Sequence, residues 1–193
     1  MKCTRFAIAQ NNGFTTRAED GNLYIEGYFA VYNSKYWLWD EAYETIEQGS
    51  FEGQTIGDIR ALTNHDSTLV LGRTTAGTLE LRTDEKGLWG RISVNQNDRA
   101  AMDLYERVKR GDVNQCSFGF DILEQDVEYS ESGPTVWHIR KVKLYEVSVV
   151  TFPAYEETSV EARKNEIDTI KKRKLQAWKK EMKEKLKGEE KWL

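Results

Sequence analysis

Hydrophobic and polar residues alternate along much of the first 160 positions, a pattern typical of half-buried β-strands. In Asn22–Asn33 (NLYIEGYFAVYN), Leu, Ile, Phe and Val occupy odd-numbered positions, while tyrosines and a glutamate occupy even ones. Two long strands are predicted at Cys116–Tyr129 and Thr135–Phe152, joined by a turn at Ser130–Pro134. Shorter strands separated by glycine or aspartate turns are predicted at Arg60–His65, Leu69–Thr75, Thr78–Arg82 and Leu88–Val94.

Helical periodicity appears in two places. Asn97–Arg110 carries Ala, Leu, Tyr and Val at i, i+3, i+4 and i+7, and Gly111 follows as a C-terminal cap. Glu161–Leu193 has no proline, no glycine before Gly188, and a narrow apolar stripe among many Lys and Glu residues. We therefore expect a mostly β, α+β domain over residues 1–160 and a charged amphipathic helical extension over 161–193.

Composition excludes several classes of protein. The 193 residues are 39% hydrophobic and 11% aromatic, which is too apolar for a disordered chain. No run approaches the roughly 18 apolar residues of a membrane span, and the N-terminus lacks a signal-peptide core, so we expect a soluble, non-secreted protein. Two cysteines, Cys3 and Cys116, and two histidines are too few for a disulfide framework or a multi-histidine metal centre.

The net charge of −4 is unevenly distributed. Residues 161–193 carry 12 Lys and Arg against 7 Asp and Glu, so residues 1–160 carry 16 against 25. An acidic body does not indicate nucleic-acid binding. The basic extension is suited to RNA, DNA or an acidic partner, but a solvated helix is the more common meaning of such a pattern.

Three segments contain residues suited to catalysis. His65 follows Ala61–Asn64 at a strand end, where alternation places it on the face of Ala61 and Thr63, although a lone histidine there is more often bonded to a backbone carbonyl. Ser117 shares a strand face with Gly119, which removes side-chain bulk beside it and suits nucleophilic attack on an extended substrate. Serine and glycine at strand ends also commonly form turns and have no catalytic role.

The third segment is Lys143–Phe152 (KLYEVSVVTF), an apolar run that resembles a strand buried on both faces. Glu146 lies inside it, where a carboxylate needs a partner. An imidazole N–H would make Glu146 the orienting member of a triad, whereas Arg140 or Lys141 would make it a structural ion pair. Both readings stay open at this point.

Together the three segments supply a base, a nucleophile and an orienting acid. The other histidine, His138, lies mid-strand near the expected hairpin end, which favours His65 as the base. A cysteine peptidase using Cys116 is a weaker alternative, because Cys116 alternates onto the face of Phe118 and Phe120.

Several motifs then resemble the prohead maturation proteases of tailed bacteriophages, which are related in fold to the herpesvirus assemblins. The resemblance covers about residues 26–161, and one departure from it is Gln48 before Gly49, where many members have proline. The motifs, in order, are Gly27–Asn33 (GYFAVYN), Glu44–Phe51 (ETIEQGSF), Leu62–Asp66 (LTNHD), Leu71–Gly72, Gly87–Leu88, Arg107–Gly111 (RVKRG), Ser117–Phe120 (SFGF) and Leu144–Tyr155 (LYEVSVVTFPAY).

This resemblance implies an assemblin-like barrel with a few flanking helices and a serine endopeptidase without metal or cofactor. The family's catalytic histidine and serine correspond to His65 and Ser117, and the third member corresponds to Glu146. The implied substrates and partners are phage scaffold and major capsid protein inside the assembling procapsid in the bacterial host cytoplasm, with self-cleavage and self-association also expected. No membrane contact is implied. The alternative is an inactive scaffold or assembly protein that keeps the protease fold.

Overall fold

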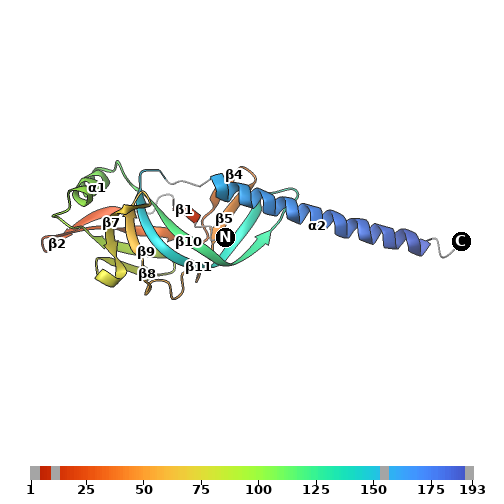
Figure 1. The fold of residues 1–193 in the computed structure, drawn as a ribbon, viewed down its shortest axis with the longest axis horizontal. Helices are drawn as coiled ribbons and strands as arrows, with labels where there is room; N and C mark the ends of the chain where they lie inside the picture. Colours follow the sequence, from red (N-terminus) through yellow and green to blue (C-terminus); the bar gives the residue numbers. More distant parts are fainter. Residues whose placement is uncertain (1–4, 10–13, 153–156, 190–193) are drawn as a thin grey trace. The chain divides into compact units, whose positions relative to one another are not determined.

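The computed structural model describes residues 5–9, 14–152 and 157–189. The chain divides into two compact units, Met1–Glu156 and Glu157–Leu193. The first unit holds all the described strands together with helix α1, and the second is formed by helix α2 (Figure 1). Cys3 lies outside the described residues.

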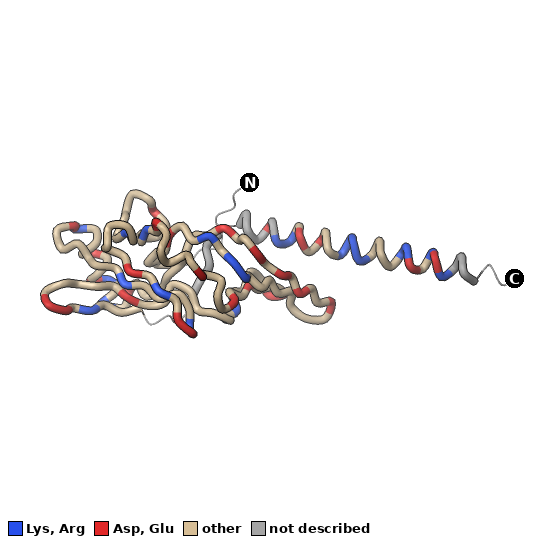
Figure 2. Tube along the Cα trace, turned by 90° about the horizontal axis from the view of Figure 1, so that it is seen from below, with Lys and Arg blue, Asp and Glu red and all other residues tan. Residues whose placement is uncertain are grey.

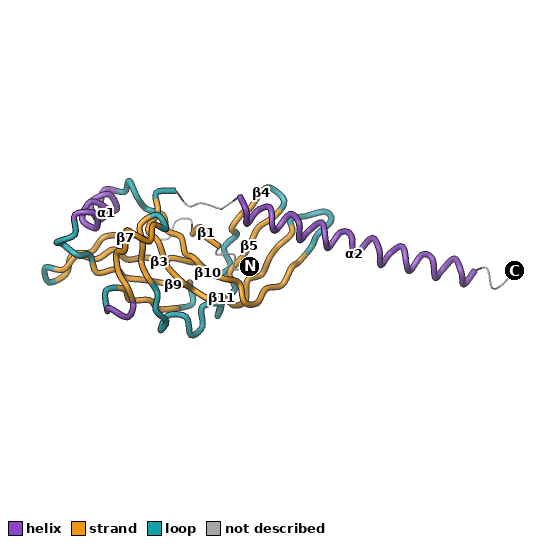
Figure 3. The backbone as a smooth tube through the Cα atoms, in the orientation of Figure 1, coloured by secondary structure: helices purple, strands orange, loops and turns teal. Residues whose placement is uncertain are grey.

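The larger sheet is built around one long antiparallel hairpin. Its strand order is β1 (Arg5–Ala9), β10 (Gln115–Glu128), β11 (Thr135–Val150), β5 (Ala42–Ile46) and β4 (Tyr36–Trp39). Strand β6 (Arg60–Thr63) pairs in parallel with the C-terminal part of β11, and antiparallel with β7 (Asp66–Arg73). The β10–β11 hairpin and its turn confirm the sequence prediction, and β5 lies beside β11 (Figure 3). Strand β11 is the central strand to which both β5 and β6 attach.

The smaller sheet is antiparallel throughout. It consists of β2 (Thr15–Glu19), β3 (Asn22–Val31), β9 (Gly87–Ser93) and β8 (Leu79–Thr83), and a 3₁₀ turn at Thr74–Ala76 precedes β8. The predicted alternation of β3 is confirmed as far as Phe29. The register then shifts between Tyr28 and Ala30, so Ala30 is buried in place of Val31.

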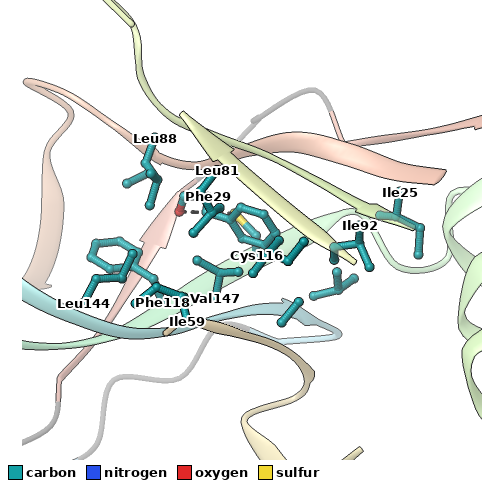
Figure 4. Packing of buried hydrophobic residues seen from close by; sticks show 14 of the residues in the cluster. Ile25, Phe29, Ile59, Leu81, Leu88, Ile92, Cys116, Phe118, Leu144 and Val147 are labelled. Carbon is teal, nitrogen blue, oxygen red and sulfur yellow. Dashed lines mark hydrogen bonds between the residues drawn. The ribbon is translucent and has the colours of Figure 1, made fainter. Parts of the chain in front are cut away.

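Both sheets contribute to one hydrophobic cluster (Figure 4). Cys116, Phe118 and Phe120 on β10 are fully buried in it, as the alternation predicted, and the Phe118 and Phe120 rings stack at 4.8 Å. The Cys116 thiol lies 3.1 Å from the carbonyl oxygen of Tyr28 on β3. The core therefore occupies the Cys116 face of β10, and the opposite face carries Ser117.

Helix α1 (Arg99–Arg110) ends before Gly111 as predicted, and it begins after the N-cap Asp98 rather than at Asn97. Asp98 accepts hydrogen bonds from the backbone N–H groups of Ala100 and Ala101, and Gly111 ends the helix with φ of 88°. The buried residues are the predicted stripe, Ala101, Leu104, Tyr105 and Val108. The helix thus packs one apolar face against the domain, as expected.

Helix α2 (Glu157–Glu189) is 33 residues long, or about 50 Å at 1.5 Å per residue. Lysine and arginine recur along it (Figure 2), and Leu175 and Trp178 are more than half exposed. The predicted C-terminal helix is present. Over the described residues, neither helix contains a stretch long and apolar enough to cross a bilayer.

The mostly β, α+β class is confirmed, but the expected barrel is not detected. Closing a barrel requires hydrogen-bonded register between the first and last strands of a sheet. Among the described residues, β1 and β4 are the ends of the strand path in the larger sheet, with β6 and β7 attached to the side of β11, and β2 and β8 end the smaller one. The two sheets share a core rather than one closed ladder.

Candidate active site

The face of the β10–β11 hairpin that points away from the core carries the candidate site. Ser117 is paired with Ser148, and Gly119 is paired with Glu146. Directly paired residues of antiparallel strands project to the same face, with Cβ atoms about 5 Å apart. Ser117, Glu146 and Ser148 therefore lie together, with Gly119 leaving a gap among them.

A bulge in β11 produces this arrangement. Phe120 pairs with Leu144 while Gly119 pairs with Glu146, so Tyr145 is the extra residue. The bulge allows both Leu144 and Val147, three positions apart, to face the core. The predicted burial on both faces is confirmed over Val147–Val150, whereas Tyr145 and Glu146 are partly exposed and Phe152, beyond the strand, is 82% exposed.

His65 lies in the tight turn between β6 and β7. Asn64 and His65 both have positive φ, at 51° and 60°, and Thr63 pairs with Asp66 across them. Two left-handed central residues are the mark of a type I′ turn, which favours Asn-Gly. A histidine at the second position costs roughly 1 kcal/mol or more relative to glycine. Alternation along β6 was therefore the wrong basis for placing His65, because the chain leaves the strand at Thr63.

Three hydrogen bonds fasten this turn to β11. The Asn64 N–H donates to the Val149 carbonyl at 3.0 Å, and the Thr151 N–H donates to Asn64 Oδ1 at 2.9 Å. The His65 N–H donates to Ser148 Oγ at 3.2 Å. Both central N–H groups of the turn are thus satisfied by the strand that carries Glu146, which compensates for the strained backbone.

The His65 imidazole contacts the Glu146 carboxylate, with 2.6 Å between Nδ1 and Oε1. The two side chains are only 17% and 12% exposed. Glu146 Oε2 accepts a second hydrogen bond, from Ser148 Oγ at 2.6 Å. Of the two partners left open by the sequence, the imidazole is the one in contact with Glu146.

The basic residues considered as alternative partners for Glu146 form other ion pairs. Arg140 pairs with Asp126 at 2.6 Å, and Lys141 pairs with Glu124 at 3.7 Å. Both acidic partners lie on β10, on the exposed part of the hairpin beyond the site.

Gly119 has a different role from the one its position suggested. From the sequence, Gly119 was expected to leave open space for a substrate beside Ser117. A Cβ placed on Gly119 would lie 2.6 Å from Glu146 Oε1, so that space is filled by the carboxylate. Because Gly119 has no side chain, the Glu146 carboxylate occupies this space, and its Oε1 contacts His65.

Ser117 itself is fully buried, and its Oγ has no hydrogen-bond partner among the described residues. A buried hydroxyl without a partner is uncommon and is found at catalytic positions. Its neighbour across the ladder, Ser148, contacts both His65 and Glu146. Hydrogen bonds join His65, Glu146 and Ser148, and Ser117 shares their face of the hairpin through its pairing with Ser148, but no hydrogen bond joins Ser117 Oγ to the imidazole. This combination of groups suits acid–base and nucleophilic chemistry.

His138 is also bonded to a glutamate, with 2.7 Å between Nδ1 and Glu47 Oε1. It lies mid-strand on β11, opposite Asp126 of β10 and Thr45 of β5. Its Nε2 lies 3.5 Å from a carboxylate oxygen of Glu128. Cys116 lies on the core face, opposite to the face of Ser117, and no group of three His, Cys, Asp or Glu within the described ranges could hold a metal ion.

Sequence reasoning missed two members of the site, Asn64 and Ser148. A signal for each was present. Asn64 is a residue type that tolerates left-handed backbone, directly before the histidine. Ser148 lies two positions after Glu146, within the otherwise apolar run Val147–Val150, which places a second polar group on the same face.

Comparison with known proteins identifies the family to which the chain belongs. The family of Caudovirus prohead serine proteases matches residues 12–173, and the chain belongs to this family. The resemblance found in the sequence is therefore confirmed. The prohead protease of Enterobacteria phage HK97 is 29% identical over 153 residues, which cover 76% of this chain and 64% of that protein, so the chain spans less than two thirds of that relative. No solved structure matches the chain significantly.

Proposed function

We propose that this chain is a serine endopeptidase of capsid maturation, which cleaves scaffold and capsid-protein segments inside the phage procapsid and also cleaves itself. Family membership supports the class of reaction. The name of the HK97 relative, a prohead protease, supports the place of action. The substrates are then the proteins that line the procapsid in the bacterial host.

In this proposal Ser117 is the nucleophile, His65 the general base and Glu146 the orienting acid. Glu146 accepts the His65 Nδ1–H and so leaves Nε2 as the basic nitrogen. Nε2 takes the Ser117 proton as Oγ attacks the scissile carbonyl, and later delivers it to the leaving amine. Water then releases the acyl group by the same route. Backbone N–H groups would stabilise the oxyanion.

The observation that carries the proposal is the 2.6 Å contact between His65 Nδ1 and Glu146 Oε1 on the face that bears Ser117. A carboxylate that is mostly shielded from water holds one imidazole tautomer most firmly. The strained turn at His65 adds support, because non-glycine residues in left-handed backbone cluster at functional sites.

The test compares intact masses of the purified chain and its Ser117→Ala variant, together with labelling by a fluorophosphonate that modifies activated serines. We expect the unaltered chain to trim itself and to be labelled at Ser117, and the variant to do neither. Loss of a triad nucleophile costs on the order of 10⁶ in kcat. Glu146→Gln should lose less, about 10⁴, because the orienting acid is the most dispensable member.

Cys116→Ser is the matched control, since it alters the neighbouring residue on the core face. It should retain both trimming and labelling. Trimming that survives Ser117→Ala and disappears in Cys116→Ser would reassign the nucleophile to Cys116. An unaltered chain that is neither trimmed nor labelled would favour the inactive assembly protein instead.

A further inference from the structure

Ser148 makes contact with both His65 and Glu146, and it lies within the motif Leu144–Tyr155, although the sequence alone assigned it no role. Its Oγ donates a hydrogen bond to Glu146 Oε2 at 2.6 Å and accepts one from the His65 backbone N–H at 3.2 Å. Ser148 is fully buried. A hydroxyl has one proton to donate and two lone pairs to accept with, so the donor and one acceptor site are in use.

The two bonds constrain different parts of the site. Glu146 has one oxygen on His65 and the other on Ser148, so the plane of its carboxylate is fixed. The His65 backbone is held in a left-handed turn that needs an anchor, and Ser148 supplies an acceptor for its N–H. Loss of this one hydroxyl therefore frees both the carboxylate and the turn.

Register places the same hydroxyl beside the third group. Ser148 is paired directly with Ser117 across the β10–β11 ladder. The residue is thus adjacent to the proposed nucleophile, base and orienting acid at once. Its proton is directed to Glu146 rather than to the imidazole, which suits a supporting role and not that of a nucleophile.

We propose that Ser148 is a positioning residue, which fixes the orientation of the Glu146 carboxylate and the position of the His65 backbone. This inference rests on the proposed function, because it assigns a role within that triad. It predicts that removal of the hydroxyl lowers the rate of the chemical step and leaves substrate binding unchanged.

The chain offers a matched control in Ser50. Ser50 is also fully buried, and its Oγ contacts the backbone carbonyl oxygens of Glu47 and Ile139, the latter at 2.8 Å. It lies beside the Glu47–His138 pair rather than the site. Ser50→Ala and Ser148→Ala therefore remove hydroxyls of equal burial, and only the second touches the triad.

The experiment measures the rate of fluorophosphonate labelling at Ser117, located by peptide mapping, and kcat and KM on a peptide cut by the unaltered chain. Ser148→Ala should lower the labelling rate and kcat ten- to a hundredfold, with KM within about twofold. Ser148→Thr, which keeps Oγ, should recover most of the rate. Ser148→Cys keeps the size of the side chain and weakens the hydrogen bonds, so it should resemble Ser148→Ala and provides a variant if Ala fails to fold.

Thermal unfolding of each variant separates positioning from general stability. Ser50→Ala should lower the melting temperature without lowering the labelling rate of the folded protein. If Ser148→Ala and Ser148→Cys label as fast as Ser50→Ala, Ser148 is only structural and this inference is wrong. If the unaltered chain is not labelled at Ser117, the proposed function itself has failed, which is a distinct result.

Discussion

Gly119→Ala tests the geometry of the site with the smallest available change. The added methyl would lie 2.6 Å from Glu146 Oε1, whereas ordinary contacts begin at 3.4 Å. The carboxylate must therefore move by about 0.8 Å, which is comparable to the whole range of donor–acceptor distances over which hydrogen bonds form. Because Oε1 is the atom bonded to His65, the variant is expected to break or weaken that contact.

The expected result is a large loss of activity in a folded protein. Misplacement of a catalytic group by about 1 Å costs roughly 10²-fold in rate. Overpacking costs about 1–3 kcal/mol, and replacing a strand glycine by alanine returns about 0.5–1 kcal/mol. The net loss of unfolding free energy is then about 0–2.5 kcal/mol, less than the usual total stability of a domain. The assay is peptide cleavage together with thermal unfolding.

Gly57→Ala is the matched control, because its Cβ would meet Gln54 O at 3.5 Å, an ordinary contact. Activity should not change. A Glu146→Ala background separates the two roles considered for Gly119. If Gly119 acts only by making room for Glu146, adding Gly119→Ala there should cost nothing further. A full hundredfold loss in that background would refute the reasoning and restore Gly119 as space for substrate.

Three further expectations follow from other parts of the chain. His138→Gln should leave cleavage intact, whereas His65→Gln should abolish it in the same peptide assay. The Arg73 guanidinium lowers the pKa of Asp58 to about 2 from its usual 3.8, so the stabilisation is fully present above pH 3.8 and is lost as pH falls toward 2. The melting-temperature difference between the unaltered chain and Asp58→Asn should accordingly stay constant from pH 7 down to about pH 4 and then shrink as the pH falls toward 2. Truncation after Arg163 should leave a folded protease that cleaves a supplied peptide but no longer associates with procapsid components. Added salt should also weaken this association. A truncated protein that is unfolded would show instead that the extension is part of the core.

Hydrophobic periodicity and turn residues predicted the elements whose conformation depends mainly on their own sequence. Helix α1 has its stripe and both caps in the sequence, and the β10–β11 hairpin has two long alternating strands and a turn. Strands β2 and β5 were missed because Thr15–Glu19 is almost wholly polar and Ala42–Ile46 is short. The parallel pairing of β5 and β6 with β11 joins segments far apart in the chain. Short-range periodicity cannot predict such pairing, because it depends only on neighbouring residues.

The sequence predicted the members of the proposed triad, but not Asn64, Ser148 or the geometry of the site. Glu146 stood out as a carboxylate inside an apolar run, whereas His65 and Ser117 were predicted through the resemblance to family motifs. The turn at His65 was not, because two consecutive positive φ values leave no hydrophobic pattern and Asn64 is followed by histidine in place of the customary glycine. The bulge at Tyr145 was also invisible in the sequence, since its cause is the packing of Leu144 and Val147 against the opposite sheet.

A histidine bonded to a glutamate is not by itself a mark of catalysis in this protein. Both histidines have one, at 2.6 Å for His65 and 2.7 Å for His138. The difference lies in what surrounds the second ring nitrogen and the backbone. His138 lies in a regular strand with a carboxylate of Glu128 3.5 Å from Nε2, a group that competes for any proton at that nitrogen. His65 lies in a strained turn whose N–H is held by the hydroxyl opposite Ser117. The left-handed backbone at His65, which His138 lacks, supports the proposal that His65 is the base.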